Sequence, residues 1–174
     1  MPTTAHPRPA RLLGALLAAL AVLAGLLAPS AASAAVRPLT SAAGPCSGTT
    51  GVTVTVDFTA FGGTEQTRCA LGAQSTGLAA MQNAGFTPTG TAHYGLAFIC
   101  RINGLPTATA DPCVNTPSAT AYWAYYHALA GATTWTFSSS GASSYAPPLG
   151  SIEAWAFGNG ATPSKTPAQV RSGT

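Results

Sequence analysis

The chain has 174 residues and a formal net charge of +3, with 6% charged and 47% hydrophobic residues. Beyond residue 34 the charged side chains are five cations and four anions, which are scattered singly and leave a balance of +1. Because no basic patch or run of like charges is present, we exclude nucleic acids and anionic membrane surfaces as partners.

The first 34 residues are predicted to be a secretory signal peptide. Arg8 and Arg11 form a positive n-region, an apolar run extends from Leu12 to Ala28, and Ala32-Ser33-Ala34 is a small-x-small cleavage site. The apolar run is at the lower length limit for a bilayer span, and the small residues after it favour cleavage over an anchor. We therefore expect a secreted protein, extracellular or loosely associated with the cell wall, without membrane attachment after cleavage.

The remainder is long enough for one domain with a hydrophobic core. We expect residues 35–49 to be an irregular lead-in, residues 50–158 to form the domain, and residues 159–174 to be a flexible tail.

Four cysteines, Cys46, Cys69, Cys100 and Cys113, lie in the exported part. An even number of cysteines in a secreted domain indicates disulfides, with three connectivities available to four residues. We predict the sequence-local pairing, Cys46–Cys69 and Cys100–Cys113. No C-x-x-C spacing is present, so a zinc site is not expected.

In the first half of the domain, residues 52–58 alternate between apolar and polar, which predicts a half-buried strand with Thr53, Thr55 and Asp57 on its outward face. Residues 65–71 are expected to return as the second strand of a hairpin. Ser75 or Thr76 then caps a predicted short helix over residues 78–82 that ends before Gly85.

The second half is predicted to be strands. Residues 94–102 form one, followed by an Asn-Gly turn. Residues 122–129 and 134–138 form an aromatic hairpin joined by an Ala-Gly-Ala loop, with Trp135 and Phe137 on its second strand. Residues 152–157 form the last strand. This order predicts an α+β, β-rich single domain: a β-grasp-like sheet with one helix, plus the aromatic β-hairpin.

No catalytic motif accompanies these elements. The sequence contains no G-x-S-x-G elbow, H-E-x-x-H helix, P-loop or G-x-G-x-x-G. The four carboxylates are not close to one another in sequence, so nothing indicates paired acid and base chemistry. We therefore expect a protein that is not an enzyme.

Three segments together resemble a known family: residues 52–58, residues 100–106, and the aromatic strands at 122–127, 135–137 and 150–157. They are similar to secreted actinobacterial proteins with a transcobalamin-like C-terminal domain, a family without an assigned function. In animal cobalamin carriers this β-rich domain covers one face of the corrin ring, and a helical domain covers the other. This chain has no helical domain, so the resemblance implies weak binding of cobalamin as an accessory to uptake, and no firm cofactor.

The aromatic residues admit two interpretations. On a strand, Trp123, Tyr125 and His127 share one face, and Trp155 belongs to the last strand. One interpretation makes these rings a core layer, since a domain with one thin helix needs their area. The other makes the rings on the face away from the helix a flat stacking platform for a small planar ligand, and His127 is a candidate axial ligand to cobalt.

Three functions follow as expectations. The first is a secreted binding module for a cobalamin-like or other planar small molecule, with Trp123, Tyr125, His127 and Trp155 as ligand-binding residues. The second is a structural or interaction module that binds a glycan or protein of the cell envelope. The third is a small secreted peptidase inhibitor whose reactive segment is the loop closed by Cys100 and Cys113.

Overall fold

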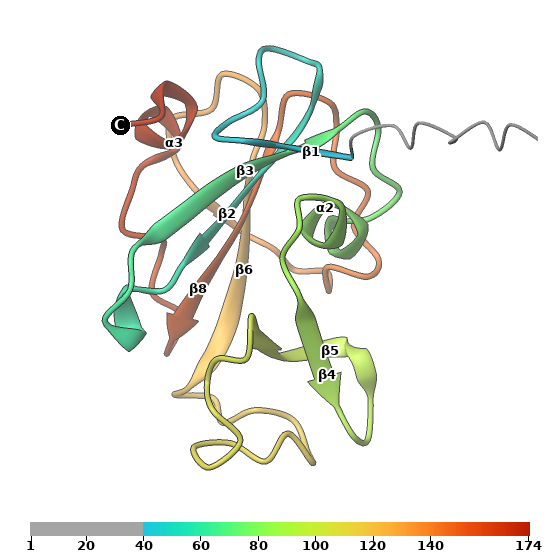
Figure 1. Ribbon diagram of the computed structural model, residues 1–174, viewed down its shortest axis with the longest axis vertical. Coiled ribbons are helices and arrows are strands. Elements are labelled where there is room, and N and C mark those ends of the chain that lie inside the picture. Colours follow the sequence, from blue (N-terminus) through green and yellow to red (C-terminus); the bar gives the residue numbers. More distant parts are fainter. Residues whose placement is uncertain (1–39) are drawn as a thin grey trace, which may run out of the picture. The chain divides into compact units, whose positions relative to one another are not determined.

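The computed structural model describes residues 40–174 (Figure 1). The predicted signal peptide and the first part of the lead-in lie outside the described residues. A six-stranded mixed sheet with the strand order β1-β3-β2-β8-β6-β7 organises the chain. Its strands are β1 (Ser41–Ala43), β2 (Gly51–Asp57), β3 (Glu65–Leu71), β6 (Tyr122–Ala128), β7 (Thr136–Phe137) and β8 (Ile152–Gly158).

The predicted first hairpin is formed by β2 and β3, which pair antiparallel in continuous register from Gly51↔Leu71 to Asp57↔Glu65. A short 3-10 helix, η3 (Thr59–Phe61), lies in the connection and ends at Gly62, whose φ of 76° suits a residue without a side chain. Strand β8 pairs parallel to β2 on its other edge. The first and last long strands of the domain are therefore neighbours at the centre of the sheet.

Helix α2 (Gly77–Asn83) covers one face of this sheet (Figure 1). The hydroxyl oxygen of Thr76 accepts a hydrogen bond from the amide of Ala79, which confirms the predicted N-cap. Gly85 follows the helix with a φ of 83°, and its amide donates to the carbonyl of Gln82. The helix packs Ala80 and Met81 against the valines of β2, and this layer is the main core.

The α+β, β-rich prediction is confirmed, and the strand order is that of a β-grasp-like sheet: hairpin, helix, then a last strand inserted beside the first. The aromatic hairpin is less regular than predicted. Strand β7 pairs with β6 only through Tyr126↔Phe137 and His127↔Thr136, and Trp135 precedes it. The main partner of β6 is β8, with which it pairs along its whole length.

Strands β4 (Pro88–Thr91) and β5 (Gly95–Ile102) form a separate two-stranded sheet. This hairpin extends below α2 in Figure 1, beside the loop that leads to β6. The predicted turn follows β5, where Asn103 and Gly104 both have positive φ values of 51° and 80°. The hairpin is therefore a projection beside the main sheet, and this position creates the cavity described below.

The prediction that Thr53, Thr55 and Asp57 face solvent is wrong. All three are buried, at 4%, 0% and 4% exposure. The polar face of β2 is covered by the C-terminal segment, in which the amide of Ser164 donates to Asp57 Oδ2 at 2.7 Å. Thr55 Oγ1 donates to Glu65 Oε1 at 2.8 Å, so the buried polar groups of this face bind one another.

Residues 159–174 are also more ordered than a flexible tail. They contain helix α3 (Pro167–Ser172), which Thr166 and Gln169 begin with a capping box. Val170 is 1% exposed and packs with Ala128 and Ile152, on the sheet face opposite α2. Helix α3 therefore shields the apolar residues on this face of the sheet from water.

The irregular lead-in likewise contains a strand. Ser41–Ala43 forms β1 and pairs antiparallel with β3. Cys46 follows it and is bonded to Cys69 on β3, which attaches the lead-in to the sheet. Residues on both sides of the predicted 50–158 therefore pack with the domain, from β1 at one end to α3 at the other.

Candidate functional site

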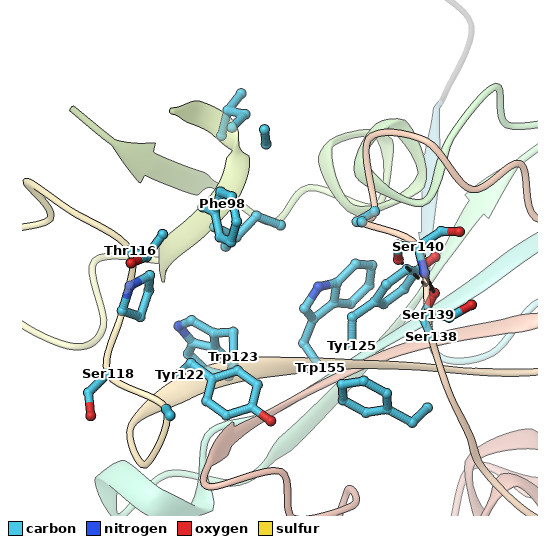
Figure 2. Close-up of a pocket in the computed structure, with 18 residues that line it drawn as sticks. Phe98, Thr116, Ser118, Tyr122, Trp123, Tyr125, Ser138, Ser139, Ser140 and Trp155 are labelled. Carbon is cyan, nitrogen blue, oxygen red and sulfur yellow. Dashed lines mark hydrogen bonds between the residues drawn. The ribbon is translucent and has the colours of Figure 1, made fainter. Parts of the chain in front are cut away.

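Within the described residues, a cavity of about 420 Å³ lies between the β4–β5 hairpin and the free edge of β6 (Figure 2). The loop before β6, the segment after β7 and the Trp155 side chain of β8 complete the lining. The lining residues are Leu96, Ala97, Phe98, Ile99, Thr116, Pro117, Ser118, Ala119, Tyr122, Trp123, Tyr125, Phe137, Ser138, Ser139, Ser140, Gly141, Ala142 and Trp155.

The floor of the cavity is aromatic because the register of β6 and β8 aligns large rings on one face. Tyr125 lies opposite Trp155, and their rings stack with centroids 4.8 Å apart and an interplanar angle of 17°. Trp123 lies opposite Phe157, and its Nε1 donates to the carbonyl of Leu105 at 3.1 Å. This bond and the stack fix the orientation of the three rings that form the floor.

Phe98 on β5 forms the opposite wall. Figure 2 shows its ring across the cavity from Trp123 and Trp155. Phe98 is 45% exposed and contacts Tyr94, with ring centroids 5.2 Å apart. The disulfide between Cys100 and Cys113 links the β4–β5 hairpin, which carries Phe98, to the loop that leads to β6. The cavity is thus an open slot between aromatic side chains of β5 on one side and of β6 and β8 on the other.

Hydroxyl groups flank the slot at both ends. Thr116 and Ser118 lie on one side and Ser138, Ser139 and Ser140 on the other (Figure 2). Ser138 Oγ donates to the carbonyl of Ser140 at 2.7 Å, which shapes this segment into a turn. No Asp, Glu, Lys, Arg or His is among the lining residues of this described cavity. The site is therefore apolar between its ends, polar at them, and uncharged.

The edge of β6 adds backbone groups to the cavity. The amide of Ser138 donates to the carbonyl of Tyr125 at 2.9 Å, so alternate residues of β6 direct their backbone groups away from β8. Trp123 belongs to this alternate set, and β7 does not extend to it. Within the described chain its N–H and C=O have no strand partner, which leaves one donor and one acceptor at the slot.

Three of the four predicted ligand-binding residues, Trp123, Tyr125 and Trp155, come together in this cavity, and His127 does not. The imidazole of His127 lies further along β6, where it stacks on Tyr145 with centroids 4.5 Å apart. Its Nδ1 is buried without a hydrogen-bond partner, and burial lowers the pKa of His127. The imidazole is therefore a packed side chain beside the site, not a group that points into it.

The burial of the aromatic residues agrees with the interpretation that they form a core layer. Trp123, Tyr125 and Trp155 are 6%, 8% and 1% exposed and belong to the main core, on the face that carries α2. The expected flat platform on the face away from the helix is not formed by them. They are core residues whose outer edges line a cavity.

The sequence did not indicate Phe98, Phe137 or the serine segment as parts of the site. Alternation placed Phe98 on a strand, but it carried no signal that the ring would remain exposed. Glu153 was also missed as a notable residue. It is 0% exposed beneath Tyr125, whose hydroxyl donates to Glu153 Oε2, and Ser151 Oγ donates to Oε1 at 3.1 Å. Burial raises the pKa of Glu153 to about 7.

The disulfide prediction is confirmed in both pairs, Cys46–Cys69 and Cys100–Cys113. Asp111 lies close to the second pair, and these three residues have the spacing of a metal-binding group. Both sulfur atoms are already bonded to each other, however, and a disulfide sulfur is not the thiolate that a metal ion requires. The cluster is a structural feature of the loop.

Comparison with protein-family models, curated proteins and solved structures finds no match to this chain. The resemblance to the transcobalamin-like C-terminal domain therefore stays a prediction. Neither helix of the described part has the length and apolar character needed to cross a bilayer.

Proposed function

We propose that this protein is a secreted, non-catalytic binding module that takes an uncharged, planar small molecule into the slot between Phe98 and the Trp123–Tyr125–Trp155 floor. The observation that carries the proposal is the pairing of a stacked aromatic floor with an exposed aromatic wall across an open cavity. A concave site lined mainly by aromatic and apolar side chains, with a few polar groups, is the usual form of a small-molecule binding site.

The size and chemistry of the cavity set the ligand class. Its volume of about 420 Å³ is within the range of about 300–1,000 Å³ for small-molecule sites. The absence of charged lining residues disfavours an ionic ligand, because a buried charge would find no counter-ion there. Hydroxyls at both ends and the free backbone groups of Trp123 would bind polar substituents at the rim of a flat, apolar ring system.

A cobalamin-like ligand is one member of this class. The cavity is small for a whole corrin with its side chains, so such a ligand would present only part of one face to the slot. Such partial contact is what the resemblance implies for a domain that covers one side of a ligand and assists its uptake. The two disulfides support export to an oxidising compartment.

Binding of Nile red, a neutral planar fluorophore, tests the slot directly. We expect emission to rise on mixing, and Phe98→Ala to weaken binding on the order of tenfold, since one aromatic contact contributes about 0.5–1.5 kcal/mol. Leu149→Ala is the matched control, because Leu149 is similarly exposed at 43% and lies outside the cavity. Equal loss in both variants, or none in either, would contradict the site. Displacement of Nile red by cyanocobalamin would support a corrin ligand.

A second candidate function is favoured by the exposed row formed by His93, Tyr94 and Phe98. Adjacent ring centroids in it are 4.4 Å and 5.2 Å apart, and Tyr94 is 49% exposed. Such a row suits contact with a glycan or protein of the cell envelope. Retention of the wild type but not of Tyr94→Ser on purified cell wall would support it.

The peptidase-inhibitor alternative has less support from the geometry. The segment between Cys100 and Cys113 turns back on itself at Thr107, whose carbonyl accepts from the amides of Ala110 and Asp111. A peptidase binds its substrate segment in an extended form. Assays against subtilisin-like and trypsin-like peptidases test this alternative.

A further inference from the structure

Tyr125 belongs to two structures at once, the cavity and a buried polar cluster beneath it. Its ring lines the slot and stacks on Trp155, and its hydroxyl donates to Glu153 Oε2. The floor of the cavity is therefore held from below by a carboxyl group that does not itself reach the slot.

The side chains that pack around Glu153 include no Lys or Arg within residues 40–174. Strand β6 presents the titratable side chains Tyr125 and His127, and the segment before β8 presents Tyr145 together with the Ser151 hydroxyl. On strand β2, the residue paired with Glu153 is the apolar Val54.

The other packed elements add no counter-ion. Helix α2 has no titratable residue. Arg68 on β3 lies beyond Val54 in the register and donates to the carbonyl of Gly85 at 2.7 Å instead. Within residues 40–174 no cation stabilises an ionised Glu153, and only the two hydroxyl donors favour the charged form.

The segment that covers this cluster is also a wall of the cavity. Ser138 to Ala142 line the slot, and Tyr145 lies over the cluster. The segment is attached to the start of α2, where the amides of Gly77 and Leu78 donate to the carbonyls of Tyr145 and Ala142 at 2.8 Å and 2.9 Å. Because Glu153 is 0% exposed, water can hydrate the ionised carboxylate only if a side chain packed on it moves. Tyr125, which is bonded to Glu153, is part of the cavity floor, and the segment that carries Tyr145 also contributes a wall of the slot.

We propose that occupancy of the slot is linked to the protonation of Glu153: the protonated carboxyl keeps Tyr125 and the 138–145 segment closed, and loss of the proton loosens both walls and weakens binding. The part that concerns a ligand rests on the proposed function. Burial raises the pKa of Glu153 to about 7, which places the transition near neutral pH. By reciprocity, a ligand that favours the closed slot also favours uptake of one proton.

The ligand-free protein provides the first test. Trp155 stacks on Tyr125, so its emission should change with a midpoint near neutral pH when the protein is titrated from about pH 5 to about pH 9. Glu153→Gln retains an oxygen acceptor and the side-chain shape but cannot ionise, and we expect it to abolish the transition. His127→Gln removes the imidazole that lies opposite Glu153 in the register, and the transition should persist in this variant. Persistence in Glu153→Gln, or loss in His127→Gln, would overturn the proposal.

Ser151→Ala keeps the test decisive if Glu153→Gln does not fold. The Ser151 hydrogen bond stabilises the charged carboxylate and lowers its pKa. Its removal should therefore move the midpoint of the emission change to higher pH. An unchanged or lower midpoint would contradict the assignment to Glu153.

The second test is the affinity for Nile red over the same pH range. We expect the Kd of the wild type to rise on the order of tenfold with pH, which corresponds to about one unit of difference in pKa between bound and free protein. The Kd of Glu153→Gln should stay flat at the low-pH value. A flat wild-type profile would overturn the link to binding. Absence of Nile red binding at every pH would overturn the proposed function, while the emission titration would still test the coupling of Glu153 to the walls.

Discussion

The hydroxyl of Tyr125 donates a hydrogen bond to Oε2 of the Glu153 carboxyl group, and the two side chains come from the antiparallel strands β6 and β8. This bond joins an aromatic ring of the cavity floor to a carboxyl group that is fully buried. Burial dominates the properties of the pair, since it raises the pKa of both Glu153 and Tyr125. The stability of the fold and the shape of the cavity thus depend on the same contact.

The stability of the protein should depend on pH through Glu153. The pKa of this carboxyl is raised on folding from 4.5 to about 7, so the folded state holds its proton more tightly than the unfolded state. The stabilisation is fully present below pH 4.5 and is lost as the pH rises to about 7, by on the order of 3 kcal/mol. Urea unfolding across this range measures it.

Glu153→Gln is the matched variant for that measurement. It should flatten the pH dependence between pH 4.5 and about 7. His127 acts in the opposite direction, because burial lowers its pKa and the unfolded chain gains a proton as the pH falls below 6.5. The quantity to compare is therefore the difference between wild type and variant at each pH. A difference that does not change with pH would contradict an effect of Glu153.

Gly77→Ala should destabilise the protein although alanine is normally the better helix residue. A Cβ at Gly77 would lie 2.2 Å from Tyr125 Oη, inside the contact with Glu153. We expect a loss of about 1–3 kcal/mol, as for overpacked cores. Gly141→Ala is the control, because its nearest neighbours would be 3.8 Å away and its φ is not positive. Thermal unfolding of both variants would show whether only the first loses stability.

Local patterns were sufficient to predict the elements that local interactions determine. The β2–β3 hairpin, the Thr76 cap of α2 and the Asn103-Gly104 turn each depend on residues a few positions apart. The disulfides were predictable for a related reason, since each joins two cysteines that follow one another in the sequence. In these cases the residue types favour the local backbone conformation directly, as a Thr does at a helix N-cap or a Gly at a positive φ.

Burial of the polar face of β2 could not be predicted in this way. Alternation correctly separates Thr53 and Thr55 from the valines, but it does not say whether a second layer covers them. That layer is formed by residues about 100 positions later, where the amide of Lys165 donates to Glu65 Oε2 at 2.9 Å. The cover depends on the parallel pairing of β2 with β8, which brings the C-terminal segment across this face.

The candidate site was predictable only for its floor. Trp123, Tyr125 and Trp155 belong to dense aromatic strands, and the strand period placed them on shared faces. His127 has the same parity, but it lies further along β6 beside Tyr145, outside the cavity. Phe98 enters the site because the β4–β5 hairpin is separate from the main sheet, and no local pattern specifies that separation.

The C-terminal helix should contribute measurably to stability. Val170 is 1% exposed and packs on Ala128 and Ile152, and Arg171 donates to the carbonyls of Ala132 and Leu129 at 2.6 Å and 2.7 Å. Val170→Ala should cost about 2 kcal/mol through lost burial and a small cavity. Ser172→Ala, at an exposed position of the same helix, should cost much less. Equal stabilities by urea unfolding would support a flexible tail after all.

Asp57 should make the fold sensitive to acid. Its burial alone would raise the pKa, but hydrogen bonds from the Thr59 hydroxyl and amide and from the Ser164 amide outweigh burial and lower it. A carboxyl with a lowered pKa stabilises the fold above 3.8, and this contribution is lost as the pH falls through the folded value. In Asp57→Asn an NH₂ group replaces one of the two carboxylate oxygens, so the N–H groups of Thr59 and Ser164 can no longer both have an acceptor. The loss of one of these hydrogen bonds should cost about 1–3 kcal/mol at neutral pH. In strong acid, where the wild-type carboxyl is protonated, the two proteins should converge in stability. A loss that is equally large in acid and at neutral pH would show that the variant disturbs packing and not the ionised hydrogen bonds.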